Sequence, residues 1–277
     1  MSSSAAVPSR EYALQTGQAA VRRLHILHDI YSPAGKRALV RAGLTSGMRV
    51  ADFGCGVGVV SRMLAEMVGP EGTVTGIDVN AAQLEQASEL CVKDGLTNTS
   101  FVEANACETG LPRDQFDLVY CRFLLLHLPD PAACLREMYA VLKPGGILVV
   151  EDGDLASATS APATALDSFA ELFGQFGQLR GLNYSLARDL YHLVKNAGFC
   201  DADLEIHQPA ILRGESRFLL NWSVEEAGPA FIDAGLITRR QLERTLSEMQ
   251  AAVDDPEVVV LMPSMSIVCA RKPTITD

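Results

Sequence analysis

The sequence has little of what marks a nucleic-acid-binding or membrane-spanning protein. Its 23 Lys and Arg residues stand against 34 Asp and Glu residues, the net charge is -11, and no run of basic residues is longer than two. A chain this acidic is repelled by a phosphate backbone, so we expect no nucleic-acid partner. The longest apolar runs, such as 258–262, are far shorter than the roughly 20 residues that cross a bilayer, so we expect no membrane segment.

Paired or metal-ligating cysteine motifs are missing as well. The seven cysteines are an odd number and include no C-x-x-C pair. We therefore expect reduced, mostly buried thiols, no metal site and a cytoplasmic location. Residues 1–10 lack the apolar segment of a signal peptide, which favours the same location.

The stretch 50–58 has the pattern of a strand, a glycine-rich turn and the start of a helix. Gly54, Gly56 and Gly58 alternate with other residues, and an apolar helical stripe follows them. Glycines in such a turn let a small molecule approach bare backbone N–H groups at a helix N-terminus. A dinucleotide turn of the form G-x-G-x-x-G would place glycine where Val59 stands, so this turn argues against NAD.

Strands and helices alternate through the first half of the chain. The strand predicted at 73–77 ends at Asp78, and an acidic side chain in that place can accept hydrogen bonds from both hydroxyls of a ribose. Further strands are predicted at 100–104, 116–121 and 147–150, with helices between them. This alternation predicts an α/β fold with a parallel sheet and helices on both faces. Ligands of such sheets bind at the carboxyl ends of the strands. Those ends carry 52–58, Asp78, 105–106, 121–122 and 151–152.

The N-terminal region is predicted to be a short tail and two helices. Residues 1–8 form a disordered tail, and 9–43 form the helices. Ser32 and Pro33 have the pattern of an N-cap followed by proline at the first helical position, which opens the second helix. These two helices either cover the ligand or pack on the edge of the sheet.

The remaining chain divides into a core and a second region. The ligand-binding core is predicted over 44–155, and 156–277 has several helical segments and the strands that close the sheet. The extra helices are then insertions above the rim of the sheet. The last strand, 257–270, is interrupted by Pro263, which suits an edge strand or a bulge.

Five motifs in one order resemble those of class I S-adenosylmethionine-dependent methyltransferases. They are 50–58, 76–78, 103–106, 116–119 and 142–146. The match covers about 35–155 with the closing strands, and 101–151 is most similar to the ubiquinone/menaquinone C-methyltransferase type. The resemblance implies a Rossmann-like, seven-stranded, mostly parallel sheet with helices on both faces, covered by the N-terminal and inserted helices.

The resemblance also implies S-adenosyl-L-methionine as the methyl donor, with S-adenosyl-L-homocysteine as its product. Asp78 would take the ribose hydroxyls, and Val79 would pack on adenine. Asn105, which stands where many members have Asp, would meet the adenine edge, because an amide both donates and accepts hydrogen bonds. Asp52 would help to hold the amino group of the methionine part. The full set implied is Asp52, Gly54, Cys55, Gly56, Gly58, Asp78, Val79, Asn105, Ala106, Cys121 and Arg122.

His127, Asp152 and Tyr12 are the candidates for a role in catalysis. His127 follows the fourth strand and either acts as acid or base at the rim or bonds only within its own loop. Asp152 and Asp154 follow the fifth strand, and one of them either serves as a base or amine-binding group or caps the next segment. Tyr12 resembles a tyrosine that closes over the cofactor in some relatives, with a packing role as the alternative.

We predict methyl transfer to a small organic acceptor, in quinone-like or other specialised metabolism by resemblance. If the inserted helices form a lid, their apolar residues suggest an apolar or aromatic acceptor. Two other classes stay open: an enzyme that uses the cofactor for a cyclisation or decarboxylation, and a binding protein that carries a cofactor site. A macromolecular acceptor and a homo-oligomeric state also stay open.

Overall fold

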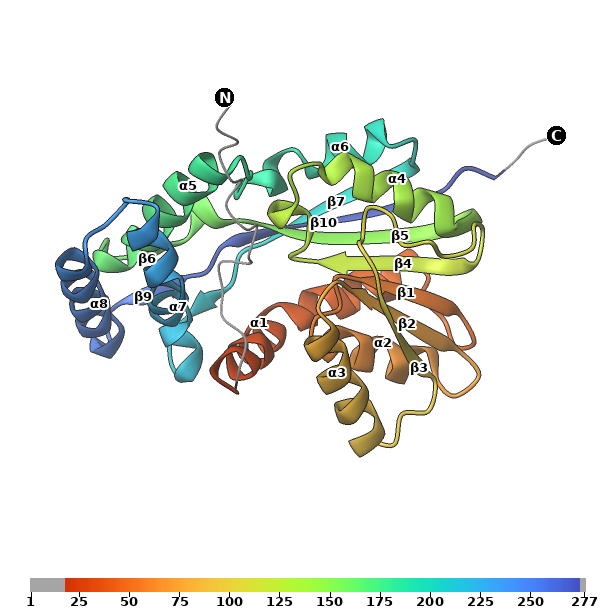
Figure 1. Cartoon of the computed structure of the whole chain (residues 1–277), viewed down its shortest axis with the longest axis horizontal. Coiled ribbons are helices and arrows are strands. Elements are labelled where there is room, and N and C mark those ends of the chain that lie inside the picture. Colours follow the sequence, from red (N-terminus) through yellow and green to blue (C-terminus); the bar gives the residue numbers. More distant parts are fainter. Residues whose placement is uncertain (1–17, 275–277) are drawn as a thin grey trace, which may run out of the picture.

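The computed structural model describes residues 18–274 and has a seven-stranded sheet at its centre (Figure 1). The strand order is β3-β2-β1-β4-β5-β10-β7. Strand β10 runs antiparallel to both of its neighbours, and the other pairs are parallel. The predicted seven-stranded, mostly parallel sheet is therefore confirmed. The strands are β1 (Arg49–Phe53), β2 (Thr73–Asp78), β3 (Thr99–Glu103), β4 (Phe116–Arg122), β5 (Leu142–Asp154), β7 (Cys200–His207) and β10 (Ser264–Arg271).

Helices cover both faces of this sheet (Figure 1). One face carries α1 (Gln18–Ala42), α2 (Val59–Val68) and α3 (Ala81–Lys93), and the other carries α4 (Pro131–Val141) and α6 (Leu190–Asn196). Parallel neighbours need crossover connections, and α2, α3 and α4 supply three of them. Within the described residues, no helix is both long enough and apolar enough to cross a membrane.

The core follows from this two-sided cover. Leu118 and Val119 of β4 and Val149 and Val150 of β5 have no exposed surface. Such continuous apolar runs are typical of central parallel strands, which are buried on both faces. Polar residues begin at the carboxyl ends of the strands, where the cover leaves room for a ligand.

Within the described part of the N-terminal region, from residue 18, one continuous helix spans the predicted junction of two helices. Helix α1 passes through Pro33 without ending. Proline inside a helix removes the hydrogen bond to the carbonyl four residues earlier. That carbonyl belongs to Asp29, which is exposed and accessible to water, while Tyr31 and Ala34 are buried in the core. The tertiary packing of α1 therefore outweighs the local cost of the proline.

A helical unit beside the sheet follows β5 and includes a small second sheet. Its helices are α5 (Ser168–Arg180), α7 (Leu219–Asp233) and α8 (Arg239–Asp254). The second sheet is antiparallel, with β9 (Val259–Leu261) between β6 (Thr159–Ala161) and β8 (Ala210–Ile211). Strands of two or three residues leave no periodic signal in the sequence, so this sheet was not predicted. Short 3-10 helices are η1 (Leu125–His127), η2 (Leu155–Ser157), η3 (Ala165–Asp167), η4 (Leu186–Arg188) and η5 (Glu215–Phe218).

Two strand boundaries differ from the prediction. Pro263 separates β9 from β10, and these strands belong to different sheets, so 257–270 is not one interrupted edge strand. Strand β5 extends well beyond 147–150 because β10 continues to pair with it past the end of β4, as far as Ser264 opposite Asp154. Asp152 and Asp154 therefore lie within a strand and do not follow it.

Candidate functional site

A cavity of about 1080 Å³ lies at the carboxyl ends of β1, β2, β3 and β4. Side chains of α1, α5 and α7 also line it. This is the edge at which parallel α/β sheets bind ligands, and the volume suits a small molecule with room for a second one.

The glycine turn after β1 is shaped for close approach by a ligand. Gly54 and Gly56 have φ angles of 70° and 53°, which side chains rarely adopt. A Cβ atom on Gly54 would lie 2.8 Å from the side chain of Leu124, so space excludes a larger residue as well. The N–H groups of Gly54 and Cys55 donate to the carbonyl of Ile77 at 2.8 and 3.0 Å, which closes the turn against β2.

Backbone groups hold Asp78 at the wall of the cavity. Its Oδ2 accepts a hydrogen bond from the Gly56 N–H at 2.9 Å, and its Oδ1 accepts one from the Asn80 N–H at 3.0 Å. Each carboxylate oxygen keeps further capacity to accept hydrogen bonds. Since Asp78 also lines the cavity, a fixed acceptor pair is available to two hydroxyl groups of a ligand.

Most of the residues implied for the cofactor line this cavity. Val79 is 66% exposed and offers an apolar surface there. The Oδ1 atom of Asn105 accepts a hydrogen bond from the Cys107 N–H at 2.9 Å, which leaves the Asn105 amide nitrogen to face other partners. The lining residues of the implied set are Gly54, Cys55, Gly56, Asp78, Val79, Asn105, Ala106 and Arg122.

Asp52, Gly58 and Cys121 lie one layer behind that wall and do not line the cavity. Cys121 has no exposed surface, because it precedes Arg122 on β4 and successive side chains of a strand point to opposite faces. Gly58 serves packing, since a Cβ atom there would lie 2.7 Å from the Cβ of Ala87 in α3. These three residues therefore lie behind the lining of the cavity, and the contacts with the cofactor that the resemblance implies for them stay predictions.

Asp52 is the charged member of this second layer. It is buried, and its Oδ2 accepts a hydrogen bond from the Ser61 hydroxyl at 2.6 Å. Burial raises the pKa of Asp52 to about 7, although the bond from Ser61 and the charge of Arg122 favour ionisation. At neutral pH the carboxyl group is therefore close to its midpoint, and a nearby positive charge would ionise it.

Arg122 is oriented by a histidine from α1. Its Nη2 lies 3.1 Å from Nδ1 of His28, and burial, reinforced by the charge of Arg122, lowers the pKa of His28 to about 4. The neutral imidazole therefore accepts a hydrogen bond from the guanidinium. Within residues 18–274, Nη1 of Arg122 is buried without a hydrogen-bond partner.

His127 lines the cavity from η1. Its ring meets that of Tyr184 edge to face, with centroids 5.7 Å apart. Burial lowers the pKa of His127 to about 3, and the positive charge of Arg23 acts in the same direction. The imidazole is therefore neutral at physiological pH.

Asp152 holds η1 and does not meet the cavity. It has no exposed surface, and its Oδ2 and Oδ1 accept hydrogen bonds from the N–H groups of Leu126 at 3.2 Å and Gly153 at 2.9 Å. Burial raises its pKa to about 7. This placement favours support of the η1 backbone, and the role of Asp152 as a base stays a prediction. Tyr12, the third candidate, lies outside the described residues.

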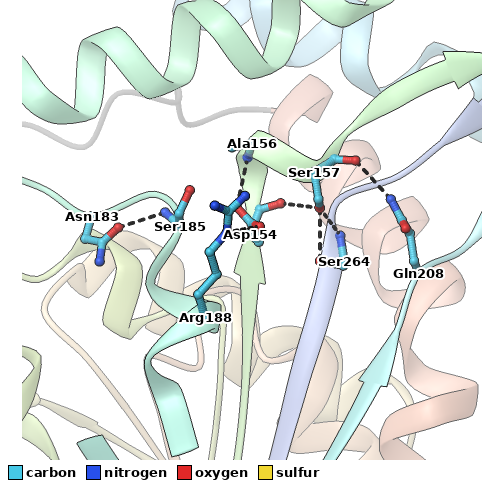
Figure 2. A network of polar contacts seen from close by, with 8 residues as sticks. All are labelled: Asp154, Ala156, Ser157, Asn183, Ser185, Arg188, Gln208 and Ser264. Carbon is cyan, nitrogen blue, oxygen red and sulfur yellow. Dashed lines mark hydrogen bonds and ion pairs between the residues drawn. The ribbon is translucent and has the colours of Figure 1, made fainter. Parts of the chain in front are cut away.

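Asp154 belongs to a polar network at the end of β5 (Figure 2). Its Oδ2 accepts a bond from Nε of Arg188 at 2.6 Å, and its Oδ1 caps η2 by accepting one from the Ala156 N–H at 3.2 Å. The Ser157 hydroxyl donates to the Asp154 carbonyl at 2.6 Å and accepts from the Ser264 N–H at 2.7 Å. The network ties β5 to β10 and η4, and of the two alternatives for Asp154 the structure shows the cap.

Comparison with known sequences matches residues 44–198 to the family described as a methyltransferase domain. The chain belongs to this methyltransferase domain family. It is 42% identical over 106 residues to a demethylmenaquinone methyltransferase of Listeria monocytogenes, a match that covers 38% of this chain and 45% of that relative. The chain thus spans less than half the length of that relative. A demethylmenaquinone methyltransferase of Geobacillus stearothermophilus is 36% identical over 183 residues, covering 61% of this chain and 78% of the relative.

Solved structures share the fold of this methyltransferase domain. A protein of Bacillus halodurans C-125, assigned as a methyltransferase, matches with a TM-score of 0.61 and 21% identity over 86% of this chain and 98% of the other. The cyclase SpnF matches with a TM-score of 0.51 and 23% identity over 86% and 79%. At such identities the likeness is one of fold, and a cyclase among the neighbours shows that this fold hosts more than one reaction.

Several cavity residues of the methyltransferase domain were not predicted from the sequence. Arg23, Tyr31, Phe123, Arg180 and Tyr184 also line the cavity. They come from segments far apart in the chain and form no motif, so only the tertiary structure brings them together. Most of these residues belong to α1, to α5 and to the segment that follows α5.

Proposed function

We propose that this domain transfers a methyl group from S-adenosyl-L-methionine to a small organic acceptor. The observation that carries the proposal is the Asp78 carboxylate, held by two backbone N–H groups beside the glycine turn at a cavity with room for two ligands. When bound, the donor supplies an electrophilic methyl group on a sulfonium, and S-adenosyl-L-homocysteine is the product.

The residues at the glycine end of the cavity fit this donor. Gly54 and Gly56 line the cavity without side chains, which suits a ligand packed against the backbone. Asp78 can accept hydrogen bonds from both ribose hydroxyls, and Val79 offers an apolar face to a base. Asp52 lies behind the turn, where its carboxyl group favours an ammonium group on the ligand.

The contribution of the chain to methyl transfer is mainly positioning. Alignment of the reacting atoms can supply about 7–11 kcal/mol of the barrier reduction. Apolar side chains of α1, α5 and α7 surround the far end of the cavity and exclude water from the acceptor. The low pKa of His127 makes its ring a poor general base, so we propose that it contacts the acceptor without taking a proton from it.

The walls support an apolar acceptor of small size. Phe169, Phe173 and Leu220 line the far end, so we propose an apolar or aromatic molecule. The names of the Listeria and Geobacillus relatives favour a quinone-like acceptor within that class. A cytoplasmic location and the absence of a nucleic-acid partner stay predictions. The second candidate is a non-methylating reaction, which the cyclase neighbour favours and which would form product without consuming the donor.

Calorimetric titration with S-adenosyl-L-homocysteine tests the proposal. We expect binding by the wild type and a loss of about tenfold or more in Asp78→Asn, since a carboxylate hydrogen-bonded to ligand hydroxyls contributes about 1.5–3 kcal/mol. Glu85→Gln is the matched control, because Glu85 is an exposed acidic residue of α3 outside the cavity. No binding by the wild type would overturn the proposal. Coupled assays with an acceptor panel then measure whether donor consumption accompanies product formation.

A further inference from the structure

One end of the cavity carries a buried arginine from α1. The whole chain has a net charge of -11, yet within the described residues the carboxylates that line the cavity, Asp78 and Glu103, are both at the ends of β2 and β3. The end of the cavity that α1, α5 and α7 form carries Arg23, which is ion-paired with Glu226, and Arg180. We call this end the acceptor chamber; it is lined by Arg23, His127, Phe173, Arg180, Tyr184 and Leu220.

Arg23 is a buried and preorganised cation in this chamber. It is 7% exposed, and its Nε donates to Oε2 of Glu226 in α7 at 2.8 Å. Glu226 is the hydrogen-bond partner of Arg23 among residues 18–274, and it engages the Nε side of the guanidinium. The two terminal nitrogens form the opposite fork, which matches the two oxygens of an anionic group.

The same chamber is apolar around this cation. Phe173 and Leu220 are buried side chains that line it, and the ring of Phe173 packs against that of Tyr184 with centroids 6.1 Å apart. Burying a guanidinium among such side chains is costly, and one carboxylate partner compensates for only part of that cost. A ligand that brings a second anionic partner and an apolar body would complete the environment.

We propose that the acceptor is a small apolar or aromatic molecule with an anionic group, and that the terminal nitrogens of Arg23 bind this group while Glu226 positions the guanidinium. This inference rests on the proposed function, because it names the class of molecule that occupies the acceptor chamber. The anion also has a consequence for His127: it offsets the charge of Arg23, which contributes to the low pKa of that ring.

A matched pair of fluorescent probes tests the proposal on the full chain saturated with S-adenosyl-L-homocysteine. The probes are 1-anilinonaphthalene-8-sulfonate and N-phenyl-1-naphthylamine, which share an aromatic body and differ by the sulfonate. We expect the wild type to bind the sulfonate about 10- to 100-fold more tightly, the ratio that one or two hydrogen bonds to a charged group give. Added KCl should weaken the binding of the sulfonate and leave that of the neutral probe unchanged.

Variants of two neighbouring arginines distinguish binding of the sulfonate by Arg23 from a nonspecific effect of positive charge. The double variant Arg23→Met with Glu226→Gln should lose the preference for the sulfonate and keep the affinity for the neutral probe, without leaving an unpaired carboxylate. Arg22→Met is the control, because Arg22 is the adjacent arginine, its side chain is 68% exposed, and it does not line the cavity. Arg23→Lys, which keeps the charge and loses the fork, should have an intermediate preference.

Each outcome supports or overturns the inference. Equal binding of both probes by the wild type, or a preference that persists in the double variant, would overturn it. If the double variant fails to fold, the ratio of the wild-type affinities for the two probes and the salt dependence of that ratio still test the inference. Failure of the proposed function is distinguishable, because it would appear first as no binding of S-adenosyl-L-homocysteine, whereas failure of this inference leaves that binding intact.

Discussion

Among single residues, Asp52 has a pKa that makes it responsive to its ligand. Burial raises that pKa to about 7, so the unliganded protein holds a proton on Asp52 below neutrality. The positive amino group of a bound donor would favour the ionised carboxylate and lower the pKa. Ligand binding and proton release are then linked at this residue, although Asp52 does not line the cavity.

Binding of S-adenosyl-L-homocysteine should therefore release a proton from Asp52. Because the pKa is higher in the free protein than in the complex, affinity should increase with pH, by up to about tenfold per unit below pH 7. Calorimetry in two buffers of different ionisation enthalpy measures the proton. Asp52→Asn should abolish the release, and Asp152→Asn should retain it because that carboxyl is on β5 and bonds to the N–H groups of Leu126 and Gly153, not to the glycine turn. Release that persists in Asp52→Asn would contradict this linkage.

Cys107 should be the most reactive thiol of the described chain near pH 7. A hydrogen bond from the Cys134 thiol lowers the pKa of Cys107 to about 7, and Cys107 is partly exposed between β3 and β4. About half of the Cys107 thiol is therefore ionised near pH 7, because its pKa lies below that of an ordinary cysteine. Mass spectrometry after brief iodoacetamide treatment should find Cys107 alkylated first. Cys134→Ala should slow the reaction a few-fold at pH 7, and an unchanged rate would show that Cys134 does not lower the pKa.

The separate elements show where local sequence decides structure and where it does not. The glycine turn and Asp78 could be predicted because their spacing alone sets a strand, a tight turn and a strand tip. Helix α1 was predicted as two helices because Ser32 and Pro33 have the pattern of a helix start, and burial of Tyr31 against distant segments outweighs that local signal. The extension of β5 likewise depends on β10, which is more than a hundred residues away in the chain.

Pro33→Ala should stabilise the protein. Pro33 is exposed, so its replacement removes no buried contact and restores an N–H group for the helical hydrogen bond of α1. We expect the free energy of unfolding to increase by about 1–2 kcal/mol, the helix preference of alanine less the entropy that proline removes from the unfolded chain. Urea denaturation measures the free energy of unfolding. Lys36→Ala, on the same exposed side of α1, is the control and should change this free energy by less than about 0.5 kcal/mol. A destabilised Pro33→Ala would mean that the proline is needed for the packing of α1.

At the scale of the whole molecule, the two ends of the cavity differ in how far sequence predicts them. The donor end is built from consecutive strand ends, so Asp78 and Asn105 follow from motifs. The acceptor chamber is assembled from α1, η1, α5 and α7, whose residues converge only in the tertiary fold. Arg23 therefore could not be predicted as a site residue, because in the sequence it is one of two adjacent arginines, a pattern that is typical of an exposed surface.

The predicted core, 44–155, depends on the closing strands that the prediction placed in 156–277. Strand β10 pairs with β5 over eight residue pairs and is itself buried, with no exposed surface at Ile267 or Val268. A fragment 1–155 would expose the apolar edge of β5, so we expect it to aggregate or remain unfolded and not to bind S-adenosyl-L-homocysteine. The control fragment 1–274 keeps β10 and should unfold cooperatively with the same melting temperature as the full chain, as measured by circular dichroism. A soluble 1–155 fragment with full affinity would show instead that the motif-bearing half is a self-sufficient domain, and that the acceptor chamber is an addition to it.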